Sequence, residues 1–377
     1  MLLNEFPLRP DIIYLNHAAV SPWPKRTRDA VTAFAEQNVL QGSLDYPEWL
    51  ETEGRLRERL RRLINAPSSA DIGLTNSTSA GLSLIAYGLD WCEGDNVVIS
   101  DQEFPSNRIV WESLSDQGVE CRQVDLLSAQ TPEEALAARC DSRTRLISVS
   151  SVQYASGLRM DLGCLGRFCG DAGILLCVDA IQSLGAVCMD VQAIGADFVV
   201  ADGHKWMLGP EGIALFYCRP ELRERLRLNQ YGWHMVEDPT DFDRRDWMPA
   251  HTARRFEAGS PNMLGIHALE ASLSLLHEVG MEAVESALLA KSRRLLALLS
   301  SLQGVELITP AAEHRYAGIV AFKPLQRSAE DVDAALSDSG VFCAVRGGGL
   351  RLSPHFYTPD DQIEQVAELI ALNIRPG

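Results

Sequence analysis

The middle of the chain alternates short apolar runs with segments whose apolar positions follow helical spacing. The apolar runs have the length of single strands, and the helix-like segments between them are long enough to cross back over a sheet. This alternation predicts βαβ units, and therefore an α/β fold in which helices cover both faces of a mostly parallel sheet. The predicted strands are residues 96–100, 145–150, 174–179, 197–201 and 212–217, and the predicted helices are 106–117 and 162–172.

The pattern changes after Asn262, where two long helical segments follow one another. The first places apolar residues at Leu269, Leu273, Leu276 and Val279, and the second at Leu289, Leu295 and Leu298. Strand-like segments at 305–308, 318–322 and 350–352 and a closing helix at 360–372 complete a smaller α+β domain. We therefore expect a large domain over residues 15–280 and a small domain that combines residues 1–14 with residues 281–377.

The composition indicates a globular enzyme rather than a nucleic-acid-binding or membrane protein. Of the 377 residues, 46% are hydrophobic and 23% are charged, which is the ordinary balance of a globular chain. The net charge of −17 disfavours a polyanionic partner such as nucleic acid. No apolar stretch is long enough to cross a bilayer, and residues 1–11 lack the pattern of a secretory signal. We expect a cytoplasmic location and no membrane partner.

The nine cysteines indicate thiols rather than disulfides or a metal site. Their number is odd, no two of them have the CxxC spacing of a zinc ligand pair, and several lie inside apolar strand-like runs. We therefore expect buried reduced thiols and no metal ion.

Chemically informative residues follow the predicted strands directly. They occupy residues 101–106, 179–182 and 202–205, and ligands of parallel sheets bind at the carboxyl ends of the strands. Lys205 stands in the run Ala-Asp-Gly-His-Lys-Trp-Met-Leu-Gly-Pro-Glu-Gly that follows an apolar strand. A lysine is costly to bury unless its amine is used, and a Schiff base with pyridoxal 5′-phosphate (PLP) uses it. For this motif alone, an exposed lysine in a glycine-rich turn is the more common explanation.

Two further segments match the needs of the same cofactor. Asp179 ends a strand 26 residues before Lys205, where a carboxylate could pair with a pyridine nitrogen, although aspartate also caps helices well. Gln182 lies one turn later. Residues 75–82, Thr-Asn-Ser-Thr-Ser-Ala-Gly-Leu, open a helix with hydroxyl side chains, which suits either a phosphate or a plain helix cap.

Together these motifs, in this order, resemble the class V aminotransferase family of fold-type-I PLP enzymes. The family includes cysteine desulfurases, selenocysteine lyases, isopenicillin-epimerase-like proteins and kynureninases. The resemblance extends from Tyr14–Ala19 to Arg351–Tyr357, and its most specific parts are the Asp179-to-Lys205 spacing and the HKW…GPEG run. It implies PLP as cofactor, an amino acid as substrate, a seven-stranded sheet in the large domain, and a homodimer with shared active sites.

The resemblance also implies a role for individual residues. Lys205 and Asp179 are the catalytic residues, with Lys205 as the Schiff-base lysine and Asp179 paired with the pyridinium nitrogen. Arg351 is implied to grip the substrate carboxylate, and His17 is a further candidate beside the substrate, as are Trp233, His234 and His355. The remaining cofactor contacts implied are Gln182 at the phenolic oxygen, Thr78, Ser79 and His204 at the phosphate, Phe104 on the ring, and Ser260 at the phosphate of a partner subunit.

The chain departs from the family pattern at three points. Residues 346–351 lack the nucleophilic cysteine that desulfurases carry before the carboxylate-binding arginine, and Cys343 lies in an apolar run. Phe104 replaces a histidine and can stack but cannot donate a proton. Asp202 stands where desulfurases have a phosphate-binding serine, and no feature of the sequence explains it.

Four chemistries therefore stay open for the sequence: transamination, β-elimination including C–S cleavage, epimerisation, and desulfuration. A class V aminotransferase-type reaction is the leading interpretation, with a Cβ–S lyase or an amino-acid epimerase as the alternative, and desulfuration through an enzyme thiol ranks last. An inactive PLP fold that serves as a binding protein is the alternative from another class. A nucleotide-binding protein is disfavoured because no GxGxxG or GxxxxGK[ST] motif follows a strand.

Overall fold

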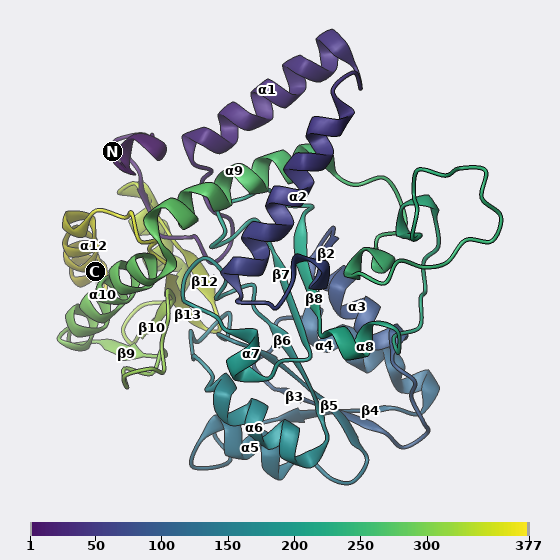
Figure 1. The fold of residues 1–377 in the computed structure, drawn as a ribbon. Coiled ribbons are helices and arrows are strands. Elements are labelled where there is room, and N and C mark those ends of the chain that lie inside the picture. Colours follow the sequence, from purple (N-terminus) through teal and green to yellow (C-terminus); the bar gives the residue numbers. More distant parts are fainter. Residues whose placement is uncertain (1, 375–377) are drawn as a thin grey trace.

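The computed structural model describes residues 2–374, and its centre is a seven-stranded sheet (Figure 1). The strand order is β2-β8-β7-β6-β5-β3-β4, and only β8 runs against the other six. The prediction of a mostly parallel seven-stranded sheet is therefore confirmed. The strands are β2 (Ile72–Thr75), β3 (Asn96–Ser100), β4 (Glu120–Val124), β5 (Thr144–Ser150), β6 (Leu175–Asp179), β7 (Phe198–Asp202) and β8 (Ala214–Cys218).

The central strands are apolar on both sides because the sheet separates two parts of the core. Along β7, Phe198 and Val200 pack into one apolar cluster, while Val199 and Ala201 pack into the other. Each fully buried side chain of this kind stabilises the fold by about 2 kcal/mol. Continuous apolar runs are typical of parallel strands covered on both faces, which is why the sequence located them so closely.

Helices cover both faces of the sheet, as predicted. On one face lie α3 (Thr78–Gly88) and α4 (Ser106–Glu112), and on the other α5 (Pro132–Ala138) and α6 (Leu162–Ala172). The predicted helix 106–117 is α4 followed by the 3₁₀ turn η3 (Ser113–Gln117). The shorter elements are α7 (Val191–Ile194), α8 (Pro220–Arg223), η1 (Leu2–Glu5), η2 (Ser69–Asp71), η4 (Trp233–Met235) and η5 (Ala253–Phe256).

A layer of three long helices lies outside the sheet. The helices α1 (Lys25–Gln41) and α2 (Tyr46–Leu63) form a hairpin that packs on α9 (Met263–Val279) (Figure 1). The segment from η4 to η5 extends away from this layer as a long loop. The sequence predicted α9 but not α1, whose only buried residue is Thr27 and which therefore has no apolar stripe to detect.

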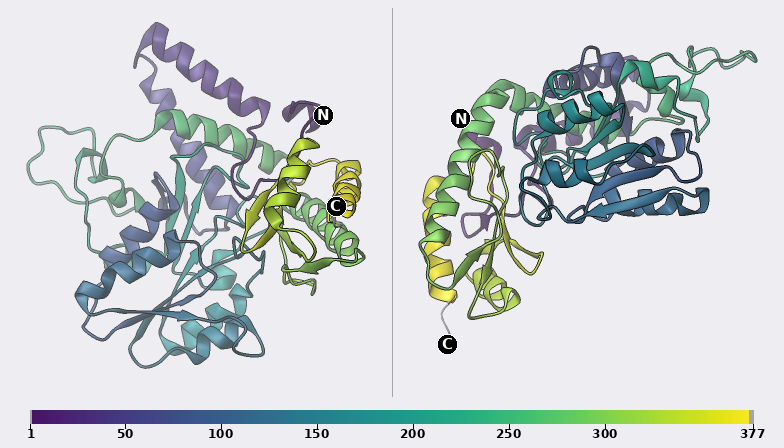
Figure 2. Two further views of the ribbon diagram at one scale, coloured as in Figure 1. Left: turned by 180° about the vertical axis from the view of Figure 1, so that it is seen from behind. Right: turned by 90° about the horizontal axis from the view of Figure 1, so that it is seen from below.

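The C-terminal part of the chain forms a separate α+β layer, as predicted. An antiparallel sheet of order β12-β13-β10-β9 is covered by α10 (Met281–Ser300), α11 (Ala329–Asp338) and α12 (Asp360–Asn373) (Figure 2). Its own apolar cluster draws on residues 295–374 and on Ile13 and Leu15 from the other end of the chain. The strands are β9 (Val305–Leu307), β10 (Val320–Pro324), β12 (Ala344–Arg346) and β13 (Gly349–Leu352), and β1 (Ile13–Tyr14) pairs with β11 (Val341–Phe342). The domain boundary near residue 280 stays a prediction; it falls at Gly280, between α9 and α10.

All nine cysteines are free thiols, but only three of them are buried: Cys169, Cys177 and Cys218. The expectation of buried thiols is therefore wrong for Cys92 and Cys188, which are exposed. Among residues 2–374, no helix combines the length and the apolar character needed to cross a membrane. The cytoplasmic location stays a prediction.

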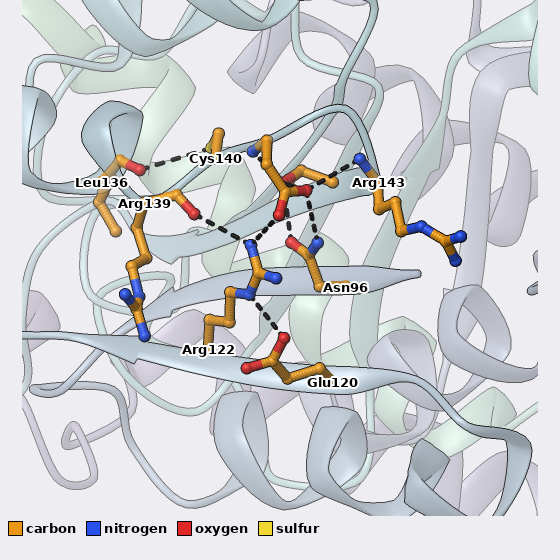
Figure 3. Close-up of polar contacts among 9 residues, drawn as sticks. Asn96, Glu120, Arg122, Leu136, Arg139, Cys140 and Arg143 are labelled. Atoms are coloured by element: carbon orange, nitrogen blue, oxygen red, sulfur yellow. Dashed lines mark hydrogen bonds and ion pairs between the residues drawn. The ribbon is translucent and has the colours of Figure 1, made fainter. Parts of the chain in front are cut away.

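Asp141 connects three neighbouring strands of the sheet through hydrogen bonds, and the residues that bind it, Asn96, Arg122 and Arg143, are labelled in Figure 3. Its carboxylate accepts hydrogen bonds from the Asn96 side chain at 3.0 Å, from Nη1 of Arg122 at 2.7 Å and from the Arg143 amide at 2.8 Å. Asn96 begins β3, Arg122 lies within β4, and Arg143 directly precedes β5. The Arg122 hydrogen bond, with the others, holds the pKa of Asp141 well below its usual range.

We expect Asp141→Asn to lower the melting temperature in a pH-dependent way. A carboxyl group whose pKa is depressed by folding stabilises the folded state above its unfolded pKa, here taken as 3.8. That stabilisation is lost as the pH falls through the lower, folded pKa. Thermal unfolding followed by circular dichroism gives the melting temperatures of the wild type and the variant. The difference between them should be constant above about pH 5 and should shrink below about pH 4. A difference that does not change with pH would contradict the role of the charge.

Candidate active site

A cavity of about 280 Å³ lies at the carboxyl ends of the strands and carries most of the residues predicted from sequence. This volume lies just below the lower end of the range typical of small-ligand sites, which is about 300 Å³. Its walls come from the large sheet, from the start of α3 and from the β12–β13 hairpin of the small domain. Its polar and aromatic lining residues are Ser77, Thr78, Ser79, Phe104, Ser106, Tyr154, Asp179, Gln182, Asp202, His204, Lys205, Glu211, Arg346 and Arg351.

Lys205 reaches this cavity from a tight turn after β7. The turn is closed by two backbone hydrogen bonds, from the Gly203 amide to Ile213 and from the Gly209 amide to Gly203. It packs against Gly185, whose φ of +91° and missing side chain let the Trp206 carbonyl approach; a Cβ at Gly185 would lie 2.2 Å from that oxygen. Lys205 itself is only 8% exposed, so its amine is held inside the cavity rather than in solvent.

Asp179 ends β6 and offers one free oxygen to the same cavity. Its Oδ1 accepts the Ile181 amide at 3.0 Å, which is the capping contact that the sequence allowed. Its Oδ2 is buried and has no hydrogen-bond partner. A buried carboxylate oxygen without a donor is costly, so this position favours a ligand that brings a donor or a positive charge.

Burial shifts the two titratable groups in opposite directions. It raises the pKa of Asp179, and it lowers the pKa of Lys205, since in each case the charged form loses hydration. A lysine with a lowered pKa is more often the neutral amine, which is the form that attacks a carbonyl or accepts a proton.

Gln182 is held by neighbours on both of its amide atoms. Its Nε2 donates to the Ala18 carbonyl at 3.0 Å, and its Oε1 accepts from Nε1 of the buried Trp206 at 2.9 Å. The side chain lines the cavity and keeps one N–H that these contacts do not use. The predicted contact with a phenolic oxygen would have to use that N–H.

The start of α3 has the geometry of a small anion site. Ser77 caps the helix by accepting the Ala80 amide at 3.1 Å, and Ser79 donates to Ser106 at 2.8 Å. Thr78 accepts the backbone amide of Asp202 at 3.0 Å, which fixes the end of β7 beside the helix. All three hydroxyl groups therefore line one wall of the cavity, at the positive end of the helix dipole.

Asp202 lies against its neighbour His204. Its Oδ1 lies 3.0 Å from Nδ1 of His204, and both atoms are buried without a hydrogen-bond partner among the described residues. The acid therefore faces its neighbouring imidazole rather than the hydroxyl groups at the start of α3.

Phe104 stands on the other wall, with the Lys205 Nζ 5.6 Å from the centre of its ring. The side chain is 42% exposed and meets the Tyr154 ring edge to face. Its position depends on the preceding residue, the buried Glu103, which anchors the loop. The hydrogen-bond donors to the Glu103 carboxylate are Ser100, Asn107, Ser150 and Gln153.

Arg351 enters the cavity from β13 of the small domain. It is 2% exposed, its Nη1 donates to the Tyr154 carbonyl at 2.8 Å, and its Nε is buried with no acceptor. A buried guanidinium with an unused N–H is well suited to a carboxylate, which it can bind through two parallel hydrogen bonds.

Two predicted site residues lie outside this cavity. His17 is fully buried beneath it, with Nδ1 at 2.8 Å from the Ser353 carbonyl and Nε2 at 2.7 Å from the Tyr357 hydroxyl. Burial lowers the pKa of His17 to about 4, so the ring is neutral and joins residues from distant parts of the chain. Ser260 is exposed and lines a second, larger cavity of about 740 Å³.

The other candidates for the substrate wall are also placed elsewhere. His355 contacts the Trp206 carbonyl at 3.1 Å and is fully buried, and Trp233 lies on the long loop. His234 belongs to a cluster with Glu53 and Glu257, whose ligand atoms lie within 4.8 Å of one another. Arg57 already bridges the two carboxylates of that cluster, so a guanidinium supplies the positive charge there.

Three of the charged or aromatic residues that line the cavity were not among the predicted site residues: Tyr154, Glu211 and Arg346. Tyr154 and Glu211 lie in loops, where no periodic pattern marks them. Arg346 ends a three-residue strand in front of two glycines, and only the fold of the hairpin shows that it lies beside Arg351.

These residues fit PLP on observations that are independent of any resemblance. The unpartnered Asp179 oxygen suits a protonated ring nitrogen, and the buried amine of Lys205 suits a Schiff base. The hydroxyl groups at the start of α3 suit a phosphate, and the unused N–H of Arg351 suits an α-carboxylate.

Comparisons with known proteins also indicate a PLP-dependent enzyme. A family model described as aminotransferase class V matches residues 13–366. A "Probable cysteine desulfurase" from Methanothermobacter thermautotrophicus is 30% identical over 389 residues, covering 97% of this chain and 96% of that protein. The cystine C–S lyase C-DES, solved with its reaction product cysteine persulfide, has a TM-score of 0.89 at 21% identity and covers 97% of this chain and 99% of its own. The apo cysteine desulfurase from Thermococcus onnurineus NA1 has a TM-score of 0.86 at 24% identity, covering 98% and 96%.

We expect Asp179→Asn to keep the fold but to slow turnover by about two orders of magnitude or more. The amide can still accept the Ile181 N–H, but it cannot stabilise a protonated ring nitrogen. Asp197→Asn is the matched control, because Asp197 is also buried and accepts a backbone amide, from Leu176, but lies outside the cavity. Steady-state kinetics and melting temperatures of both variants separate the two effects. Near wild-type turnover in Asp179→Asn would contradict a catalytic role and would leave Asp179 only its structural hydrogen bond to the Ile181 amide.

Proposed function

Because the chain belongs to the class V aminotransferase family and is a PLP-dependent enzyme, we propose that it is a Cβ–S lyase that acts on a cysteine derivative. The reaction splits R–S–CH₂–CH(NH₂)–COOH with one water into pyruvate, ammonia and R–SH. The Cα proton is removed, the Cβ–S bond breaks, and the sulfur leaves with the electron pair.

The observation that carries this proposal is a cavity with a lysine base and no thiol. None of the nine cysteines lines it. Cys343 lies between β11 and β12, with its Sγ 3.1 Å from a carboxylate oxygen of Asp333, and burial raises the pKa of this thiol well above its usual range. A desulfurase needs a reactive thiolate to take up the sulfur, and Cys343 is neither placed nor ionised for that task.

Three side chains could perform the elimination. PLP, when bound, supplies a carbonyl for the substrate amine and a ring that stores the electron pair released at Cα. Lys205 accepts the Cα proton in its neutral form, and Arg351 fixes the substrate by its α-carboxylate. Asp179 keeps a positive charge at the ring nitrogen.

The presence of Phe104 in the cavity favours a reaction whose leaving group departs without being protonated. A phenyl ring at this position cannot act as an acid, and it gives the cavity an apolar surface 5.6 Å from the Lys205 Nζ. Sulfur anions leave more readily than alkoxide or amide anions because thiols are the stronger acids. The name of the relative at 30% identity, a probable cysteine desulfurase, also supports a sulfur-containing amino acid as substrate.

The homodimer expected from sequence is part of this proposal. Ser260 lines the cavity of about 740 Å³ together with Asn76, which directly precedes the helix cap Ser77. The segment that carries Ser260 therefore lies near the start of α3, but Ser260 does not line the cavity of Lys205 within one chain. This placement suits a residue that contributes to the active site of a partner subunit. A monomer in sedimentation equilibrium would remove this part of the proposal.

The test is to incubate the holoenzyme with L-cystine and L-cysteine, with and without an α-keto acid, and to identify products by mass spectrometry. We expect pyruvate, ammonia and a persulfide from cystine, without any requirement for the keto acid. Cys343→Ser should leave this activity unchanged because the thiol lies outside the cavity. Products that appear only with a keto acid would show transamination instead. Loss of sulfur release in Cys343→Ser would show a desulfurase.

A further inference from the structure

The active-site cavity contains a second arginine on the same face of the same hairpin as Arg351. In the register of β12 and β13, Ala344 lies opposite Arg351 and Arg346 lies opposite Gly349. Directly opposed residues share one face of a sheet, as do residues two apart along a strand, so both arginines project from one face. Their cross-strand neighbours on that face are Gly349 and Ala344, neither of which offers a charge to a guanidinium group.

Neither arginine has a carboxylate partner among residues 2–374. The Nη1 of Arg346 donates only to the carbonyl of the adjacent Val345, at 2.8 Å, and the side chain is otherwise exposed toward the cavity. Burial, and then the repulsion from nearby Arg346, lowers the pKa of Arg351 to about 10. Two guanidinium groups this close repel each other when no counter-ion lies between them, and bound anions would offset that repulsion.

The remaining charges of the cavity do not supply those anions. Of its three carboxylates, Asp179 faces the expected ring nitrogen and Asp202 pairs with His204. Glu211 is exposed on the turn after Lys205 and forms no ion pair within the described chain. A cofactor phosphate has its own site at the start of α3, and the α-carboxylate of an amino acid would satisfy Arg351. Arg346 is then left without a counter-ion.

We propose that Arg346 binds a second anionic group at the far end of the substrate side chain. The inference rests on the proposed function: the sulfur substituent R of the cysteine derivative carries a carboxylate or a sulfur oxyanion. Arg351 holds the α-carboxylate, Arg346 holds the distal anion, and the scissile Cβ–S bond lies between these two anchors. Arg346 is thus a specificity-determining residue that favours acidic over neutral cysteine derivatives.

A matched pair of probes isolates the distal charge. S-carboxymethyl-L-cysteine and S-carbamoylmethyl-L-cysteine have nearly the same shape and differ in whether the substituent ends in a carboxylate or an amide. We expect the holoenzyme to prefer the acid by about tenfold to a hundredfold in kcat/KM for pyruvate release, the usual effect of one charge-assisted hydrogen-bonded pair. S-sulfo-L-cysteine, as a third probe, separates a preference for sulfur oxyanions from one for carboxylates.

Arg346→Met should bring the ratio of the two kcat/KM values close to one, and Arg346→Lys should restore part of it because the charge returns without the planar fork. Arg293→Met is the control, since Arg293 is exposed on α10 of the small domain, outside the cavity. An equal preference of the wild type for both probes would overturn the proposal. So would an Arg346→Met variant that loses PLP while the ratio is unchanged, because the arginine would then hold the cofactor.

A second readout keeps this proposal separate from the proposed reaction. Dissociation constants for the same probes come from the absorbance change of the bound cofactor on titration, whether or not a product forms. If the acid binds more tightly and Arg346→Met removes that difference while no pyruvate appears, the role of Arg346 stands and the lyase reaction is wrong. If pyruvate forms from both probes at equal kcat/KM, the lyase reaction stands and the role of Arg346 is wrong.

Discussion

The burial of opposite charges at the ends of two adjacent strands governs this structure. β6 and β7 deliver Asp179 and the turn with Lys205 to one cavity, and both side chains lose most of their hydration there. Burial raises the pKa of Asp179 and lowers the pKa of Lys205, because each charged form loses hydration. Keeping both side chains charged in a cavity without water is therefore unfavourable. A ligand with a protonated ring nitrogen and an aldehyde resolves both problems, because the carboxylate gains a cation and the amine is consumed in a covalent bond.

The small domain completes the cavity with positive charge. Its β12–β13 hairpin brings Arg346 and Arg351 to the edge of the large sheet, and the N-terminal segment binds the same domain through β1 and β11. Beneath the Lys205 turn, His17 and His355 join residues from both ends of the chain and from the turn itself. These buried, neutral rings connect the N-terminal segment, the C-terminal segment and the Lys205 turn by hydrogen bonds.

The sequence predicted those parts of the fold that leave a strong local pattern. Strands such as β7 are apolar on both faces, and α6 begins with an aspartate cap and ends at a glycine, so both were located to within a residue or two. The helix α1 was missed because most of its surface is polar, and the reversed direction of β8 leaves no mark in a run of apolar residues. Motif and spacing pointed to Lys205 and Asp179, and the family resemblance pointed to Arg351; the structure brings the three side chains to one cavity. Arg346 was not predicted, since only a cross-strand register places it, and His17 was assigned to the substrate although tertiary packing buries it below the cavity.

The most direct test of the account is chemical labelling of the lysine. Borohydride reduction of the holoenzyme, followed by proteolysis and peptide mapping, locates the residue that carries the pyridoxyl group. Because Lys205 is the lysine that lines the cavity with Asp179, the label should appear on the peptide that contains Lys205, and Lys205→Ala should abolish both the label and turnover. A label on any other lysine, or turnover that survives in Lys205→Ala, would contradict the central claim.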